Sequence, residues 1–242
     1  MTYCVALYLK DGLVMLSDTR TNAGVDHIST FGKMHVFEVP GERCMTLMAA
    51  GNLAITQSVV NLLREGVELG EQPETLASAP TMFRAAQLVG AAVRQVYATD
   101  GAAMQAQGVT FDASFLLGGQ IKGRGMRLFQ VYAAGNFIEA TADTPYFQIG
   151  EHKYGKPILD RAATHETAIE DGVKLVLISM DSTLRSNLSV GLPVDLAVYR
   201  KGDLKLSARR RITEDDAYFR MVREKWSEAL RESYRAIPTP EW

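Results

Sequence analysis

Two apolar stretches at the start of the chain predict a β-hairpin. They cover residues 2–9 and 13–18, and a Lys-Asp-Gly turn signal separates them. A three-residue loop with Gly12 in the left-handed conformation would place Asp18 on the sheet face of Thr2. A two-residue Asp-Gly loop would place Asp18 on the other face, and the sequence alone does not choose between the two registers.

Further stretches with strand or helix periodicity follow in blocks. Strands are predicted at 34–39, 44–50, 112–118, 126–133, 144–149, 195–200 and 204–211. Helices are predicted at 52–66, at 75–98 with an interruption near Pro80, and twice within 156–186. Runs of strands followed by runs of helices favour an α+β fold with antiparallel sheets over a Rossmann fold or a TIM barrel. The composition shows no break, so we expect one domain over residues 1–242.

A last amphipathic helix is predicted at about 213–235. Thr213 is a candidate N-cap residue. The apolar stripe of the helix consists of Phe219, Val222, Trp226 and Leu230. We expect this stripe to pack on the core of its own chain, with a contribution to a subunit contact as the alternative.

The composition excludes several classes of protein. The 242 residues are 47% hydrophobic and 22% charged, with a formal net charge of -2, which gives no support for a nucleic-acid or membrane partner. Only Cys4 and Cys44 are cysteines and no CxxC motif occurs, so we expect a reducing, cytoplasmic compartment. The first residues do not resemble a signal peptide, and no apolar run approaches the length of a membrane span.

Common cofactor and catalytic motifs are also absent from the sequence. There is no GxxxxGK[ST], GxSxG or HExxH motif, and the four histidines form no close pair at metal-ligand spacing. We therefore expect neither a metal nor a cofactor.

Thr2 offers the most informative chemistry. Removal of Met1 would leave a threonine with a free amine, which can act as general base for its own hydroxyl. The ordinary pKa of an α-amine is about 7.7–8.0, which suits proton transfer near neutral pH. Many proteins have a threonine at this position, so the assignment depends on the neighbouring sequence.

Segments in the first 54 residues provide that support. They are Thr2 at a strand start, Ser17-Asp18-Thr19-Arg20 after the hairpin, Gly32-Lys33-Met34, and Ala49-Ala50-Gly51-Asn52-Leu53-Ala54 before a helix. In this order they resemble the proteasome β-subunit superfamily, and most closely its bacterial subfamily Anbu (ancestral β-subunit). The stretch 17–24 is the most specific element, and the resemblance covers nearly the whole chain. It implies the four-layer αββα sandwich of the N-terminal nucleophile hydrolases.

The resemblance also implies roles for individual residues. Thr2 would be the nucleophile and, through its amine, the base. Lys33 would lie beside it and tune its proton affinity, while Asp18 would hold Lys33 charged and oriented. The backbone N–H of Gly51 would be an oxyanion donor, a contribution typically worth about 10²–10³ in rate.

A second set of residues would bind substrate. Thr21 and Asn22 would pair with an extended peptide by main-chain hydrogen bonds. Ala49 and Leu53 would shape the pocket for the residue before the cleaved bond. The expected substrate is therefore a peptide or protein.

The polar stretch 181–187 resembles the loop that supports the nucleophile in the superfamily, with a spacing closer to the HslV-type peptidase. Asp181 would then support the Thr2 amine, assisted by Ser186 or Ser182. Carbonyls of this loop hold a monovalent cation in the HslV-type enzyme. The alternative is that the stretch is only a polar helix end.

One segment departs from the superfamily pattern. A Gly-Ser-Gly element usually supplies a serine to the nucleophile amine, and the matching segment 150–155 has no serine. Either Glu151 or His152 takes over the proton handling, or the region is remodelled.

The resemblance thus predicts a cytoplasmic threonine endopeptidase that assembles into a homo-oligomeric ring or shallow spiral. An ATPase partner is not identifiable from the sequence. One rival is an amidase of the same fold that acts on a small peptide-like substrate. Another is a catalytically silent assembly subunit, which the combination of Thr2, Asp18 and Lys33 argues against.

Overall fold

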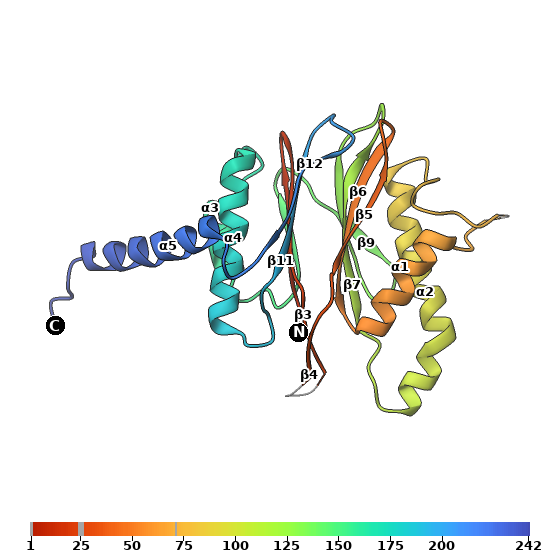
Figure 1. Ribbon diagram of the computed structural model, residues 1–242, viewed down its shortest axis with the longest axis horizontal. Helices are drawn as coiled ribbons and strands as arrows, with labels where there is room; N and C mark the ends of the chain where they lie inside the picture. Colours follow the sequence, from red (N-terminus) through yellow and green to blue (C-terminus); the bar gives the residue numbers. More distant parts are fainter. Residues whose placement is uncertain (1, 24–26, 71) are drawn as a thin grey trace.

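The computed structural model describes residues 2–23, 27–70 and 72–242, and its centre consists of two five-stranded antiparallel sheets (Figure 1). The first sheet has the order β10-β1-β2-β11-β12, and the second has the order β5-β6-β7-β8-β9. The first contains β1 (Tyr3–Leu9), β2 (Gly12–Asp18), β10 (Tyr146–Gly150), β11 (Val194–Arg200) and β12 (Leu206–Ile212). The second contains β5 (Met34–Val39), β6 (Arg43–Gly51), β7 (Ala113–Ile121), β8 (Arg127–Val131) and β9 (Phe137–Glu139).

Helices cover the outer faces of both sheets, as Figure 1 shows. They are α1 (Leu53–Glu65), α2 (Met82–Ala106), α3 (Lys156–Ala162) and α4 (Ile169–Ser186), and a further helix, α5 (Ala217–Ala236), follows β12. The pair α1 and α2 packs on the second sheet, while α3 and α4 pack on the first, and a third apolar layer fills the space between the sheets. The predicted α+β fold with four αββα layers is therefore confirmed.

The first hairpin has a two-residue loop, as in one of the two predicted registers, but the loop is Lys10-Asp11 instead of Asp11-Gly12. Cys4 lies opposite Ser17 and Leu9 lies opposite Gly12, so the loop consists of residues 10 and 11 alone. By the two-residue alternation, Asp18 lies on the sheet face opposite to that of Cys4 and Thr2, as in the two-residue alternative. This register points alternate apolar side chains of both strands toward α4, and a shift of one strand by one residue would turn its side chains toward the layer between the two sheets.

Helix α2 starts later than the periodicity predicts. The structure places its first residue at Met82 and its last at Ala106, instead of 75–98. Pro80 restricts the residue before it to extended conformations, so a helix cannot run through this point without strain. Thr81 provides the N-cap, since its Oγ1 accepts a hydrogen bond of 2.9 Å from the Arg84 N–H.

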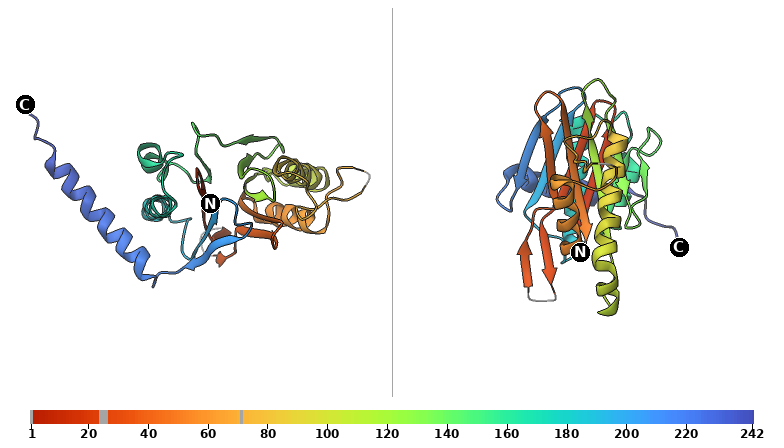
Figure 2. Two further views of the ribbon diagram at one scale, coloured as in Figure 1. Left: turned by 90° about the horizontal axis from the view of Figure 1, so that it is seen from above. Right: turned by 90° about the vertical axis from the view of Figure 1, so that its right-hand side faces the viewer.

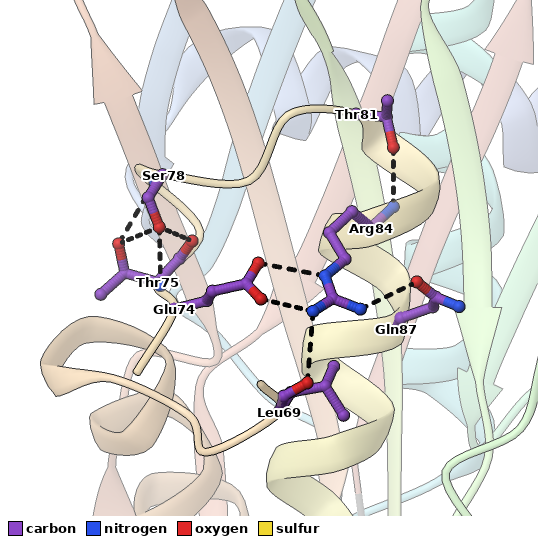
Figure 3. Close-up of polar contacts among 7 residues, drawn as sticks. All are labelled: Leu69, Glu74, Thr75, Ser78, Thr81, Arg84 and Gln87. Carbon is purple, nitrogen blue, oxygen red and sulfur yellow. Dashed lines mark hydrogen bonds and ion pairs between the residues drawn. The ribbon is translucent and has the colours of Figure 1, made fainter. Parts of the chain in front are cut away.

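The connection between α1 and α2 is fixed by the same arginine (Figure 3). The Arg84 guanidinium binds the Glu74 carboxylate through two nitrogens and also donates to the carbonyl of Leu69 and to Gln87. This network ties the loop to the first turn of α2.

Two further elements were not predicted from the sequence. The ribbon of β3 (Arg20–Ala23) and β4 (His27–Thr30) extends below both sheets in Figure 1, and β9 is a short strand at the edge of the second sheet. Both are short, so their local periodicity is weak.

Helix α5 departs most from expectation. It starts at Ala217 with Asp216 as N-cap, not at Thr213, and it projects away from the four layers (Figures 1 and 2). Only Phe219 and Val222 of this helix are buried, whereas Leu230 is 49% exposed. The prediction that its whole apolar stripe packs on the chain's own core is wrong for the second half.

Candidate active site

An open cleft of about 630 Å³ lies where β1 begins and β6 ends. Its lining residues come from both sheets and from the start of α1. They are Thr2, Thr21, Lys33, Ala49, Ala50, Gly51, Asn52, Leu53, Thr56, Asp112 and Gly150. The cleft thus brings together most of the residues singled out in the sequence.

Thr2 stands at the inner end of this cleft and is 7% exposed. Its carbonyl oxygen accepts a hydrogen bond of 2.6 Å from the Glu151 N–H. Gly150 has φ +79°, and a Cβ at that position would lie 2.0 Å from the same oxygen. Only glycine permits this close approach, so the end of β10 fixes the backbone of Thr2. The predicted removal of Met1 concerns a residue outside the described part of the chain.

Lys33 and Asp18 form a buried ion pair behind the cleft. The Lys33 Nζ lies 2.8 Å from Asp18 Oδ1, and the two side chains are 6% and 0% exposed. The same ammonium donates to the Arg20 carbonyl at 2.6 Å, and the Tyr3 N–H donates to Asp18 Oδ1 at 3.1 Å. Burial raises the pKa of Asp18, and the Lys33 ammonium and the Tyr3 N–H act in the opposite direction.

Backbone contacts hold Lys33 at this place. Its carbonyl accepts a hydrogen bond of 3.0 Å from the Ala49 N–H, which pins the start of β5 to β6. Arg20, whose carbonyl binds the ammonium, is the first residue of β3. The unpredicted ribbon therefore begins with a contact to Lys33.

Gly51 marks the turn from β6 into α1. It has φ +114°, and a Cβ there would lie 2.4 Å from the Asp112 carbonyl oxygen, so the turn requires glycine. The Asn52 N–H donates to that carbonyl at 2.8 Å, and Asn52 Oδ1 caps α1 by accepting from the Ala54 N–H at 3.0 Å. The N-terminus of α1 thus faces the cleft, where its dipole favours negative charge.

The predicted substrate residues are distributed as follows. Thr21, Ala49 and Leu53 line the cleft. Asn22 belongs to β3, but its side chain lies outside the described part of the structure. Thr56 and Asp112 also line the cleft, although neither was predicted as a site residue; Asp112 had one signal in the sequence, its position at a predicted strand start.

Asp181 and Ser186 are not brought to Thr2. Asp181 is 1% exposed and sits within α4, where its carboxylate binds Arg185 at 3.0 Å and Arg223 of α5 at 2.6 Å. Ser186 is exposed at the end of α4, and neither residue lines the cleft. The reason is helical periodicity, which turns Asp181 toward α5. Arg223, its partner, was not identified from the sequence.

The two residues considered in place of the missing serine, Glu151 and His152, lie in the loop between β10 and α3 and have different partners. The Glu151 carboxylate accepts a hydrogen bond of 3.0 Å from Asn187, the C-cap residue of α4. The exposed His152 ring instead contacts its own neighbour, with Nδ1 3.2 Å from the Gly150 carbonyl oxygen.

Within residues 2–23, 27–70 and 72–242, no group of three or more His, Cys, Asp or Glu side chains is arranged to hold a metal ion. None of the helices in these ranges combines the length and the apolar character that crossing a membrane requires.

Residues 2–199 match the family model described as "Proteasome subunit". No curated protein matches the chain. Solved structures do match over its full length. A Gly-1 mutant of Anbu from Hyphomicrobium sp. strain MC1 is 51% identical, with 100% of both chains covered and a TM-score of 0.92. Anbu (ancestral beta-subunit) from Yersinia bercovieri is 51% identical, with 99% of both chains covered and a TM-score of 0.91.

A third structure is described as the helical assembly of the Anbu complex from Pseudomonas aeruginosa. It is 48% identical, covers 99% of this chain and 98% of its own, and has a TM-score of 0.92. The chain therefore belongs to the proteasome subunit family, in its Anbu group. The resemblance predicted from the sequence is confirmed, and the four layers are those of the N-terminal nucleophile hydrolases.

Proposed function

We propose that the protein is a threonine peptidase whose nucleophile is the hydroxyl of Thr2 after removal of Met1. The observation that carries the proposal is the shared cleft of Thr2 and Lys33, with the Lys33 ammonium bound to the buried Asp18. A fixed positive charge beside an N-terminal threonine favours the neutral form of the amine, which is the form that accepts a proton.

The proposed reaction proceeds in two stages. The Thr2 amine takes the proton of its own hydroxyl while Oγ1 attacks the amide carbonyl, and the N–H of Gly51 and the N-terminus of α1 stabilise the oxyanion. The ammonium then returns the proton to the leaving nitrogen, which leaves an ester on Thr2. Water hydrolyses this ester with the amine again acting as base.

Substrate would bind as an extended strand. We assign Thr21 and Asn22 of β3 to main-chain pairing with the peptide, and Ala49 and Leu53 to the pocket beside the reacting bond. The position of Thr21, Ala49 and Leu53 in one cleft supports this assignment.

Intact-mass measurement before and after treatment with a threonine-directed β-lactone tests the mechanism. We expect the untreated protein to lack Met1 and the treated protein to carry one adduct. Thr2→Ala should form no adduct. Thr56→Ala is the matched control, because Thr56 supplies another hydroxyl in the same cleft and the adduct should persist. Retention of Met1, or an adduct on Thr2→Ala, would contradict the proposal.

Two alternative functions are separated by substrate. A panel of peptides, esters and small amides distinguishes a peptidase from an amidase of the same fold. Cleavage of the small amides alone would favour the amidase, and Met1 loss without any turnover would favour a silent assembly subunit.

We further propose that the chain forms a homo-oligomer, ring or spiral, and that it folds as one domain. The Pseudomonas aeruginosa relative, described as a helical assembly, supports the first point, and the exposed apolar side chains of the projecting α5 provide a surface for it. Leu230→Glu should lower the mass measured by light scattering if α5 contributes. A cytoplasmic location is proposed from the composition, and an ATPase partner has no support in the described residues.

A further inference from the structure

The loop after β10 lies directly against the nucleophile. Gly150 faces Tyr3 in the strand pairing, and the next residue, Glu151, donates its N–H to the Thr2 carbonyl oxygen at 2.6 Å. Because position 150 admits no side chain, Glu151 carries the first side chain of this loop beside Thr2. The Thr2 amine lies within about 3.6 Å of its own carbonyl oxygen by covalent geometry, so it is close to Glu151 as well.

The sheet order shows where the Glu151 carboxylate is held. Its Oε2 accepts a hydrogen bond of 3.0 Å from Asn187 Nδ2. Glu151 follows β10, whereas Asn187 belongs to the loop that leads into β11. In the order β10-β1-β2-β11, these two strands flank β1 and β2. The Glu151–Asn187 hydrogen bond therefore lies at the end of the sheet where strand β1 begins, which is also where the Thr2 amine lies.

Asn187 is itself firmly placed. It is 9% exposed, its N–H donates to the Thr183 carbonyl at 2.9 Å, and its Oδ1 accepts from the Ser189 N–H at 2.8 Å. A buried amide fixed in this way orients the carboxylate that it binds. His152, the other titratable candidate in this loop, is exposed and lines a separate depression with Tyr146 and Lys156.

We propose that Glu151, oriented by Asn187, is the positioning residue for the Thr2 amine and stabilises its ammonium form. The inference rests on the proposed function and deepens it. Glu151 and Asn187 thus take the role of supporting the Thr2 amine, which the resemblance had implied for Asp181. The Asp181 carboxylate is instead bound to Arg185 and Arg223.

The charges around the amine determine the expected effect. Lys33 shares the cleft with it from the position before β5, and its positive charge disfavours the ammonium form, but Asp18 is already paired with that lysine. Asp112 lines the cleft from the start of β7, and Glu151 approaches from the end of β10. Removal of the Glu151 charge should thus lower the amine pKa.

The test measures this pKa without any need for turnover. The full-length protein is prepared with Thr2 as its first residue, if necessary by cleavage of an added leader, and its mass confirms this N-terminus. It is then treated with acetic anhydride at pH values from 6 to 10. Acetylation of the N-terminal peptide is quantified by mass spectrometry. The pH at which acetylation is half-maximal reports the pKa of the amine. We expect Glu151→Gln to lower this midpoint by about one pH unit, and a fall of at least half a unit supports the proposal. A smaller change or a rise overturns it.

Two further variants define the cause. Asn187→Leu retains the carboxylate but removes its orienting donor, so the midpoint should shift by less than in Glu151→Gln. His152→Gln, the matched control, should leave the midpoint unchanged. Equal thermal unfolding of wild type and Glu151→Gln shows that both are folded. The β-lactone assay on Thr2 reports separately on the proposed function, so a failure there leaves the titration of the amine interpretable.

Discussion

Two buried aspartates of this chain have opposite surroundings. Asp18 is 0% exposed and pairs with Lys33 beside the cleft. Asp181 is 1% exposed and pairs with Arg185 and Arg223 between α4 and α5. The sequence analysis assigned both to Thr2, but the structure brings only Asp18 there.

The difference lies in the counter-charges that the fold provides. Asp18 binds the ammonium of Lys33, which also lines the cleft. A substitution at Asp18 should therefore change the position of the charge beside the proposed nucleophile. Asp181 binds two guanidinium groups, one of which belongs to the projecting helix α5. A substitution at Asp181 should therefore weaken the attachment of α5 to α4. A buried carboxylate requires such partners in either place, and burial alone therefore does not identify a catalytic group.

The largest expected effect separates the two residues by reactivity. Asp18→Asn should slow adduct formation at Thr2 by about 100-fold or more, because Lys33 loses the charge that orients it. Asp181→Asn should remain within about threefold of wild type. The measurement is the β-lactone modification rate by intact mass. A similar loss in both variants would remove the distinction between them.

The next effect concerns stability and α5. Asp181→Ala should lower the free energy of unfolding by about 3 kcal/mol, near the lower end for a broken buried pair because Arg185 is half-exposed. Urea unfolding at one protein concentration measures this change, and hydrogen exchange should show faster opening of α5. Glu224→Ala, an exposed change on the same helix, serves as control and should stay within about 0.5 kcal/mol.

The partly buried His35, which faces positive charges, sharpens the comparison. Burial, together with Arg64 and Arg209, lowers the pKa of His35 to about 4. The unfolded state, with an ordinary histidine pKa near 6.5, binds more protons between these values, so stability is lost as the pH falls through that window. Between pH 7.5 and 5 this amounts to about 2 kcal/mol.

Urea unfolding of wild type and His35→Gln at both pH values tests this expectation. The variant should lose about 2 kcal/mol less than wild type over the interval. Parallel losses in the two proteins would show that His35 is not the group that titrates.

The smallest expected effect concerns a neutral buried group next to Thr2. The Tyr3 hydroxyl is bound to Ser179 of α4 at 2.6 Å and also to Gln148 of β10. Tyr3→Phe should cost about 1 kcal/mol of stability, because a neutral hydrogen bond contributes less than a buried charge pair. In a double-mutant cycle with Ser179→Ala, purely additive losses would argue against this bond.

Much of the fold could be predicted from local pattern. The alternation of apolar residues located the long strands, and helical spacing located α1, α3 and α4. The start of α2 was misplaced because residues before Pro80 have helical composition without a cap. The ribbon of β3 and β4 was missed because four-residue strands carry too little periodicity.

The candidate site divides in the same way. Thr2, Lys33, Gly51, Ala49 and Leu53 line one cleft, as the resemblance implied, and all of them lie at the ends of strands or at a helix start. Asp181 and Ser186 did not, because the face of a helix that meets a partner depends on which helix packs against it.

By itself, the sequence determined the class of fold, the threonine at the start of β1 and the lysine and glycine that share its cleft. Strand alternation and turn chemistry, which act over a few residues, were sufficient for the class of fold, whereas the places of Lys33 and Gly51 beside Thr2 were implied by the resemblance to the proteasome β-subunit superfamily. The tertiary structure decided the hairpin register, the partner of Asp181 and the bond between Glu151 and Asn187. The last two depend on contacts between residues 42 and 36 positions apart, which local periodicity does not encode, and the register depends on which face of the hairpin packs against α4.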